Sequence, residues 1–216
     1  MKVCEFSFRE LDKKWIGIED RKSCKKLAKK IKMKKLLCPI FGYFYIDREN
    51  GLLLRVLGNI ERDGRNKLYL DNNLLFDDEI VIDYDFISKF DINILSEEVV
   101  KNIEGSIVLE NKLDIHYKNV NNFLNTRDMD CLDNFRNDSF PDDIQVLLRN
   151  KDDNPDEILW ARIEGIMDVK PDVLICKLLS SSYYNEEYDE NVMVGVKYFK
   201  EEESLKIVGL LKRREK

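Results

Sequence analysis

The sequence is poor in metal-binding residues and lacks the common nucleotide-binding spacings. It has one histidine, His116, and no C-x-x-C pair among its five cysteines, so a Cys/His zinc site is not expected. Its nine glycines form neither G-x-G-x-x-G nor the phosphate loop G-x-x-x-x-G-K-[ST], and the nucleophile motif G-x-S-x-G is missing. We therefore expect no metal, no cofactor and no serine-hydrolase centre.

Long hydrophobic runs are also missing. No apolar stretch approaches the ~18 residues that a membrane-spanning helix requires, and the N-terminus lacks the continuous apolar region of a signal peptide. An odd number of scattered cysteines favours small buried thiols in a reducing compartment over disulfides; they are Cys4, Cys24, Cys38, Cys131 and Cys176. These absences predict a cytoplasmic protein that does not bind membranes.

Charge is abundant but unevenly divided along the chain. Of its 216 residues, 36% are charged and 44% are hydrophobic, which is typical of a folded protein with a heavily solvated surface. Residues 1–38 hold thirteen Lys/Arg and five Asp/Glu, a net charge of +8, whereas residues 39–216 carry a net −14. An acidic body repels the phosphate backbone, so nucleic acid is an unlikely ligand and a basic protein is the favoured partner.

Residues 1–138 predict an α+β part. Alternation of Cys4, Phe6 and Phe8 with polar neighbours favours a strand at the start of the chain. Helical spacing predicts a basic helix over 22–32 that Ser23 could cap. Further strands are expected at 13–19, 40–47, 52–58, 67–70, 79–86, 106–111 and 112–120, with a turn at 49–51, a helix after Ser96 and a polar linker over 130–143.

Residues 139–216 predict a separate β-rich domain. Five strand-like runs at 143–150, 157–167, 172–179, 191–199 and 205–211 are separated by acidic or turn-rich loops. Short strands at this spacing are typical of a small antiparallel sheet or barrel. The expected fold class is therefore α+β, strand-rich, with mostly antiparallel sheets and a few short helices.

The most basic stretch is KKLAKKIKMKKLL, residues 25–37, which holds seven lysines and no acid. Nucleic-acid binding would favour aromatic partners nearby, and a membrane-surface helix a broader apolar face. The stripe of Cys24, Leu27, Ala28 and Ile31 is thin, and a helix continued beyond Lys32 would bury lysines. The sequence favours a short helix that packs one narrow apolar face against the core and exposes its lysines to solvent.

Two groups of carboxylates could support chemistry. Asp83 and Asp85 would share one face of a strand, after the acidic run 77–79, and could offer oxygen ligands to Mg²⁺ or Ca²⁺. The favoured interpretation is the solvated face of a packed strand. Glu110-Asn-Lys112, with Asp85 or Asp91 upstream, has the skeleton of a metal-dependent nuclease site. His116 is more typical of a surface or packing residue than of a catalyst.

Two segments resemble bacterial protein families. The helix ILSEEVVKNIEG followed by DCLDNFRNDS is similar to the pattern of immunity proteins of bacterial polymorphic-toxin systems, through Leu95, Ser96, Lys101, Asn125, Asp130-Cys131-Leu132-Asp133 and Ser139. PDDIQVLLRNKDDNPDEILWARIEGI resembles small bacterial domains of unknown function that occur near toxin–immunity loci.

The resemblance implies a protein without catalysis that binds and neutralises a cognate toxin; the alternative is the nuclease-like enzyme. An acidic inhibitor would attract a basic toxin over a distance, and tyrosines would anchor the contact. Two loops carry such residues: Asp152, Asp153, Asp156 and Glu157, and then Tyr183, Tyr184, Glu186, Glu187, Tyr188, Asp189 and Glu190. The competing interpretation is that these acidic loops only keep the domain soluble.

Overall fold

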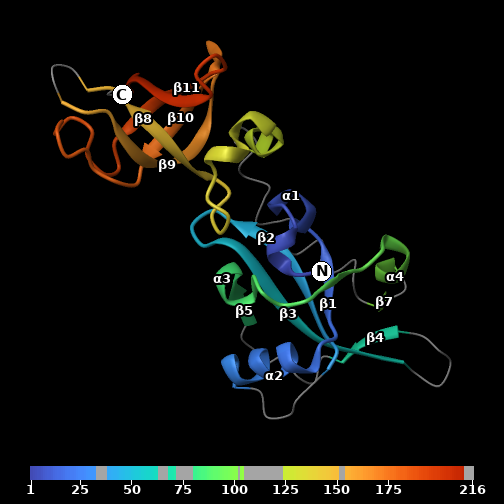
Figure 1. Cartoon of the computed structure of the whole chain (residues 1–216). Helices are drawn as coiled ribbons and strands as arrows, with labels where there is room; N and C mark the ends of the chain where they lie inside the picture. The colour runs from blue at the N-terminus through green and yellow to red at the C-terminus, as the bar shows by residue number, and fades with distance from the viewer. Residues whose placement is uncertain are drawn as a thin grey trace, which may run out of the picture. The chain divides into compact units, whose positions relative to one another are not determined.

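The chain folds into two compact units. A computed structural model (Figure 1) describes residues 1–32, 38–62, 68–71, 80–101, 103–104, 124–150 and 154–211. The units are Met1–Tyr117 and Lys118–Lys216, whereas the boundary expected from the sequence lies after residue 138. Antiparallel sheets dominate both units and the helices are short, which confirms the strand-rich α+β class.

The first unit is built on a seven-stranded sheet. Its strands follow the order β6-β1-β2-β3-β4-β7, and β5 pairs with β3 beside this path. All the pairs are antiparallel except β4 with β7. The strands are β1 (Trp15–Ile18), β2 (Ile40–Asp47), β3 (Gly51–Arg62), β4 (Leu68–Asp71), β5 (Ile80–Asp83), β6 (Asn93–Ile94) and β7 (Ile103–Glu104). The strands expected at 106–111 and 112–120 lie outside the described residues.

Both faces of this sheet are covered. Along β2, Ile40, Phe44 and Ile46 join the main core, while Tyr43 joins a smaller cluster with Trp15. Because side chains alternate between faces, continuous apolar runs are what a strand buried on both sides needs. The rings of Trp15 and Tyr43 pack edge to face, with their centroids 5.7 Å apart.

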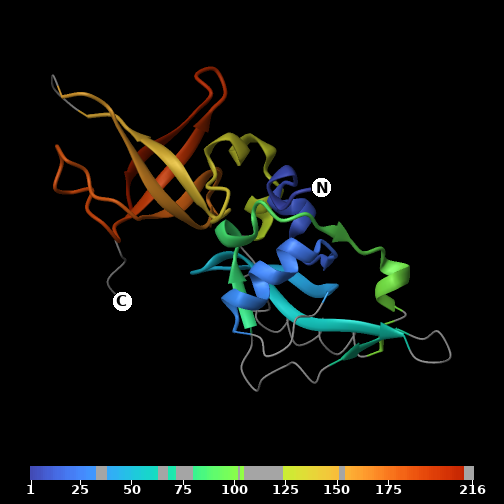
Figure 2. The same cartoon turned by 60° about the horizontal axis from the view of Figure 1, so that its bottom comes forward.

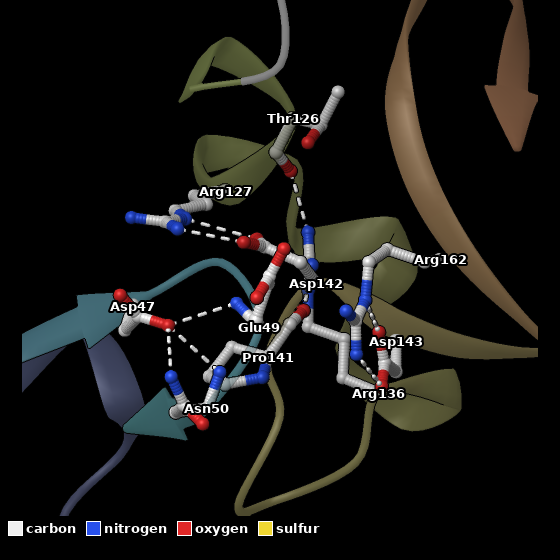
Figure 3. A network of polar contacts seen from close by, with 10 residues as sticks. All are labelled: Asp47, Glu49, Asn50, Thr126, Arg127, Arg136, Pro141, Asp142, Asp143 and Arg162. Carbon is white, nitrogen blue, oxygen red and sulfur yellow. Dashed lines mark hydrogen bonds and ion pairs between the residues drawn. The ribbon is translucent and has the colours of Figure 1, made fainter. Parts of the chain in front are cut away.

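A tight turn joins β2 to β3, as expected. The Asp47 carboxylate accepts hydrogen bonds from the backbone N–H groups of Glu49 and Asn50, at 2.9 and 2.8 Å (Figure 3). Gly51 then takes φ = 76°, a conformation that glycine adopts without a steric penalty. The Asp-x-x-Asn-Gly sequence thus fixes the register of this pair.

The prediction of a strand at the N-terminus is wrong. Residues Val3–Glu5 form the 3-10 helix η1 and Phe8–Leu11 form the short helix α1. Ser7 and Glu10 make a reciprocal capping box, in which the Ser7 hydroxyl accepts from Glu10 N at 3.3 Å and Glu10 accepts from Ser7 N at 2.8 Å. This local S-x-x-E signal outweighs the period-two alternation around it.

The basic helix is present as α2 (Arg21–Lys30; Figure 1), and the burial of its side chains follows the prediction, with Cys24 and Leu27 fully buried and the lysines exposed. Asp20, not Ser23, caps it: its carboxylate accepts from Ser23 N at 2.7 Å and from the Ser23 hydroxyl at 2.8 Å. The helix ends before Lys32, as the apolar stripe predicts. Residues 33–37 lie outside the described part of the chain.

The acidic strand expected over 79–86 is shorter than predicted. β5 ends at Asp83, and helix α3 (Tyr84–Ile87) begins at once. Asp83 and Asp85 therefore do not share a strand face, and the arrangement proposed for a cation does not form. Tyr84 and Ile87 instead pack into the main core. The helix after Ser96 is present as α4 (Glu97–Lys101), with the Ser96 hydroxyl 3.4 Å from Val99 N.

The second unit is a closed five-stranded barrel, whose strands wrap a common interior in Figure 2. Neighbours are antiparallel, and β12 closes the barrel by pairing in parallel with β8. All five predicted strands are confirmed, as β8 (Asp143–Leu148), β9 (Glu157–Met167), β10 (Lys170–Leu178), β11 (Met193–Phe199) and β12 (Ser204–Leu210). On β9, the inward residues from Leu159 to Ile163 alternate with outward ones.

The segment expected to be a linker is packed into the barrel. It begins with the 3-10 helix η4 (Asp130–Phe135), in which Leu132 is fully buried in the barrel core, and the 3-10 helix η3 (Asn125–Asp128) lies just before it. Arg127 donates two hydrogen bonds to Asp142, at 2.9 and 2.6 Å, and Arg162 donates two to Asp143, at 2.6 and 2.9 Å (Figure 3). Paired charges thus connect this segment and the start of β8 with the barrel wall.

The burial pattern of α2 predicts the effect of two kinds of substitution. Leu27→Asp places an unpaired carboxylate in a fully buried position and should lower the free energy of unfolding by more than about 3 kcal/mol. Lys26→Glu with Lys29→Glu, both exposed, should change it by less than about 1 kcal/mol. Urea unfolding followed by circular dichroism measures both, and equal losses would contradict the assignment.

Candidate protein-binding site

The most exposed aromatic residues of the barrel lie in the loop between β10 and β11, residues 179–192. Tyr183 is 86% exposed and Tyr184 is 44% exposed. Their rings meet edge to face, with the centroids 4.9 Å apart and the planes at 85°. Exposed paired rings are unusual on a solvated surface, because each leaves a large apolar area in water. We call residues 179–192 the tyrosine loop.

A single carboxylate anchors the tyrosine loop to the barrel. Glu157, the first residue of β9, accepts a hydrogen bond from the Ser182 hydroxyl at 2.5 Å and from Tyr183 N at 2.7 Å. Asn150, which follows β8, donates its side-chain N–H to the same carboxylate at 3.1 Å. Three donors from two separate loops therefore converge on Glu157.

The charge state of Glu157 follows from these contacts. Desolvation raises the pKa of the Glu157 carboxyl, but the hydrogen bonds from Ser182, Tyr183 and Asn150 together outweigh it. The pKa therefore lies below the ordinary value of 4.5. The carboxylate is ionised at neutral pH, where its acceptor oxygens are strongest.

Hydrogen bonds within the loop fix the rest of its shape. The Ser182 hydroxyl accepts from Tyr184 N at 3.3 Å and from Asn185 N at 3.0 Å, and Ser182 N donates to the Tyr188 carbonyl at 2.8 Å. At the other end, the Asp189 carboxylate accepts from the Ser181 hydroxyl and from Glu190 N. The loop is thus a closed set of turns joined to both flanking strands.

Tyr188 has a different role from the other two tyrosines. Its side chain is half-buried and packs against the hydrophobic core of the barrel. Its backbone N–H donates to the Asn185 carbonyl at 3.0 Å. Tyr188 therefore holds the base of the loop, while Tyr183 and Tyr184 remain at the surface.

The structure divides the predicted contact residues into three groups. Glu157, Tyr188 and Asp189 stabilise the loop through the contacts described above. Side chains that remain exposed are Asp156, Tyr183, Tyr184, Glu186, Glu187 and Glu190. Asp152 and Asp153 lie outside the described residues.

The sequence reasoning missed several residues that form the site. Ser181, Ser182 and Asn150 provide the hydrogen bonds that order the loop. Ile158, next to Glu157 on β9, points outward and is 67% exposed. The Ser-Ser pair directly before Tyr-Tyr was a usable signal, since serine hydroxyls commonly cap turns.

Most residues of the two alternative chemical sites lie in parts of the chain that the structure does not describe. Glu110, Lys112, His116 and the acidic run 77–79 lie outside the described residues. Among the residues that the structure describes, no group of three or more His, Cys, Asp or Glu side chains is placed to hold a metal ion. Asp91, an upstream candidate, forms an isolated β-bridge with Lys2.

In comparisons with known proteins, no protein-family model, curated protein or solved structure matches the chain. Within the described residues, no helix is both long enough and apolar enough to span a bilayer.

The Glu157 anchor predicts a titration at one backbone amide. Because the pKa of Glu157 is depressed in the folded chain, its hydrogen bonds should be intact above pH 4.5 and lost as the pH falls through the lower folded value. In two-dimensional NMR spectra, the Tyr183 amide proton should shift upfield with a midpoint below pH 4.5.

The control for this titration is Glu157→Gln, which keeps the shape of the side chain but removes the charge. In this variant the Tyr183 amide should no longer titrate, and it should exchange with solvent faster than in the native chain. Asp156 is exposed and directly precedes Glu157, and Asp156→Asn should leave both the titration and the exchange rate of the Tyr183 amide unchanged. A Tyr183 amide that titrates equally in all three chains would exclude Glu157 as the anchor.

Proposed function

We propose that this chain acts by binding a protein, and that the partner docks on the tyrosine loop. One observation carries the proposal: two adjacent exposed tyrosines, in fixed ring geometry, stand on a loop that a carboxylate and its hydrogen bonds hold in place. Tyrosine is enriched among the residues that dominate binding energy at interfaces. A loop ordered before binding loses less conformational entropy on association.

The partner that fits this surface is basic. Exposed carboxylates of Glu186, Glu187 and Glu190 lie in the same loop as the tyrosines, and Asp156 precedes its anchor. These carboxylates form an acidic rim that attracts positive charge at a distance and raises the association rate. The tyrosine rings supply the affinity once the partner covers them. A partner with Lys or Arg around an apolar patch would complement both features.

The specific role that we propose is that of an immunity protein, which neutralises a cognate bacterial toxin by covering it. The resemblance in residues 94–139 and 141–166 supports this role, and so does the acidic character of the loop. Toxins that act on nucleic acids are commonly basic because they must bind phosphate. An acidic partner with an ordered aromatic surface could compete for such a face.

The experiment begins with the neighbouring gene. The protein that it encodes is purified and mixed with this chain, and binding is measured by isothermal titration calorimetry. The same gene is then expressed in bacterial cells with and without this chain. We expect a complex and restored growth; growth inhibition that this chain relieves without forming a complex would contradict a role through binding.

Substitution of the tyrosines tests the docking surface. Tyr183→Ala and Tyr184→Ala should each raise the dissociation constant of the complex by roughly 10-fold or more, because each removes an aromatic anchor. Val169→Ala is the matched control, since Val169 is also 86% exposed but lies in the β9–β10 turn. Equal affinities for the three variants and the native chain would exclude the tyrosine loop as the contact.

Charge reversal tests the acidic rim separately. Glu186→Lys with Glu187→Lys should slow association by roughly 10-fold at low salt, with a smaller effect at high salt. Glu201→Lys with Glu203→Lys makes the same net change in the exposed β11–β12 turn and serves as the control. If both pairs slow association equally in a stopped-flow measurement, net charge and not the loop guides the partner.

A further inference from the structure

Two cysteines far apart in the sequence meet at one edge of the first unit. Cys24 lies in the first turns of α2 and is fully buried, whereas Cys38 precedes β2 and is exposed. The Cys24 thiol donates to the Ile18 carbonyl at 3.2 Å, and the Cys38 thiol donates to the Glu19 carbonyl at 3.1 Å. The two sulfurs therefore bind consecutive carbonyls of the same strand end.

The sheet register explains why they meet. β1 and β2 pair antiparallel with Ile18 opposite Ile40, so that Cys38, two residues before Ile40, lies near the residue that follows Ile18. Asp20 caps α2, and its carbonyl accepts from Cys24 N at 2.9 Å. Strand pairing and helix capping thus place both cysteines beside the end of β1.

The two thiols are close enough that Cys38 influences the pKa of Cys24. Burial is the largest cause, and the neighbouring Cys38 side chain the second, of a rise in the pKa of the Cys24 thiol to about 12. Cys24 also accepts a hydrogen bond from Ile40 N, just past Cys38. Cys176 is buried as well, but in the barrel core, where burial alone raises the pKa of its thiol.

We propose that Cys24 and Cys38 form a reversible dithiol–disulfide pair, oxidised by low-molecular-weight disulfides such as oxidised glutathione. The exposed Cys38 thiolate attacks the small disulfide, forms a mixed disulfide and releases one thiolate. The Cys24 thiol then gives its proton to the released thiolate, and its sulfur attacks the Cys38 sulfur and releases the second thiolate. The protein loses two protons and two electrons, and the small disulfide gains them as two thiols.

The consequence is a covalent bond between α2 and the start of β2. The expectation that all five cysteines are buried is wrong, because Cys4, Cys38 and Cys131 are exposed. A bond between Cys24 and Cys38 restricts the unfolded chain and stabilises the first unit. The lysine-rich helix would therefore be more firmly held under oxidising conditions.

The test uses the full chain in buffers with fixed ratios of reduced to oxidised glutathione. After acid quenching and alkylation, mass spectrometry should find one cross-linked peptide joining Cys24 to Cys38, with no glutathione retained on either of these two residues. The bond should reopen at reducing ratios. Oxidation should also raise the melting temperature by several degrees.

Three variants make the result decisive. Because Cys38 is exposed, Cys38→Ser should leave the fold intact. In this variant Cys24 should remain alkylatable, and oxidation should no longer raise the melting temperature. Cys24→Ala should leave a stable glutathione adduct on Cys38, and Cys131→Ser should behave as the native chain. A lasting adduct on Cys38 in the native chain, a cross-link between other cysteines, or full alkylation at oxidising ratios would each overturn the proposal.

Discussion

The hydrogen bonds that converge on the Glu157 carboxylate determine the shape of the surface on which the proposed function depends. One ionised side chain at the start of β9 connects the tyrosine loop with Asn150 at the end of β8. Without it, Tyr183 and Tyr184 would stand on a loop held only by its internal hydrogen bonds and by Tyr188 at its base. A carboxylate that accepts several hydrogen bonds is a strong local constraint, because leaving its donors unpaired is costly.

The barrel is stabilised at its other end by a similar principle. Asp142 and Asp143 are consecutive, so that their side chains leave the backbone in different directions and each meets its own arginine, Arg127 or Arg162. A buried ion pair contributes less to stability than its geometry suggests, since both charges lose their hydration. The ion pairs contribute more clearly to the position of this segment, because a displaced Asp142 or Asp143 would lose its arginine partner.

The strands were predictable where hydrophobic periodicity had no competitor. The five barrel strands and β1 to β3 carry apolar runs bounded by turn residues, and the expected ends lie within about two residues of the observed ones, except that β3 continues from 58 to Arg62. The pattern was misleading where a short polar signal outweighed it. Ser7 and Glu10 convert an alternating segment into a helix, and Asp20 precedes the position where Ser23 was expected to cap.

The candidate site was only partly predictable, for a different reason. The sequence located the acidic and aromatic residues, since composition alone marks them. It did not indicate that Glu157 would bind Ser182 and Tyr183, because these contacts span 25 and 26 positions and depend on barrel closure. Local patterns carry no information about such long-range pairs.

The competing explanation for the loop is that its acids only provide solubility. Carboxylates at Glu186, Glu187 and Glu190 would suffice for that purpose on a disordered loop. Two exposed tyrosines add apolar area and reduce solubility, and the hydrogen bonds of Ser182 and Glu157 hold their backbone in one conformation. A loop selected for solubility needs neither feature, whereas a contact surface needs both, and this difference favours binding.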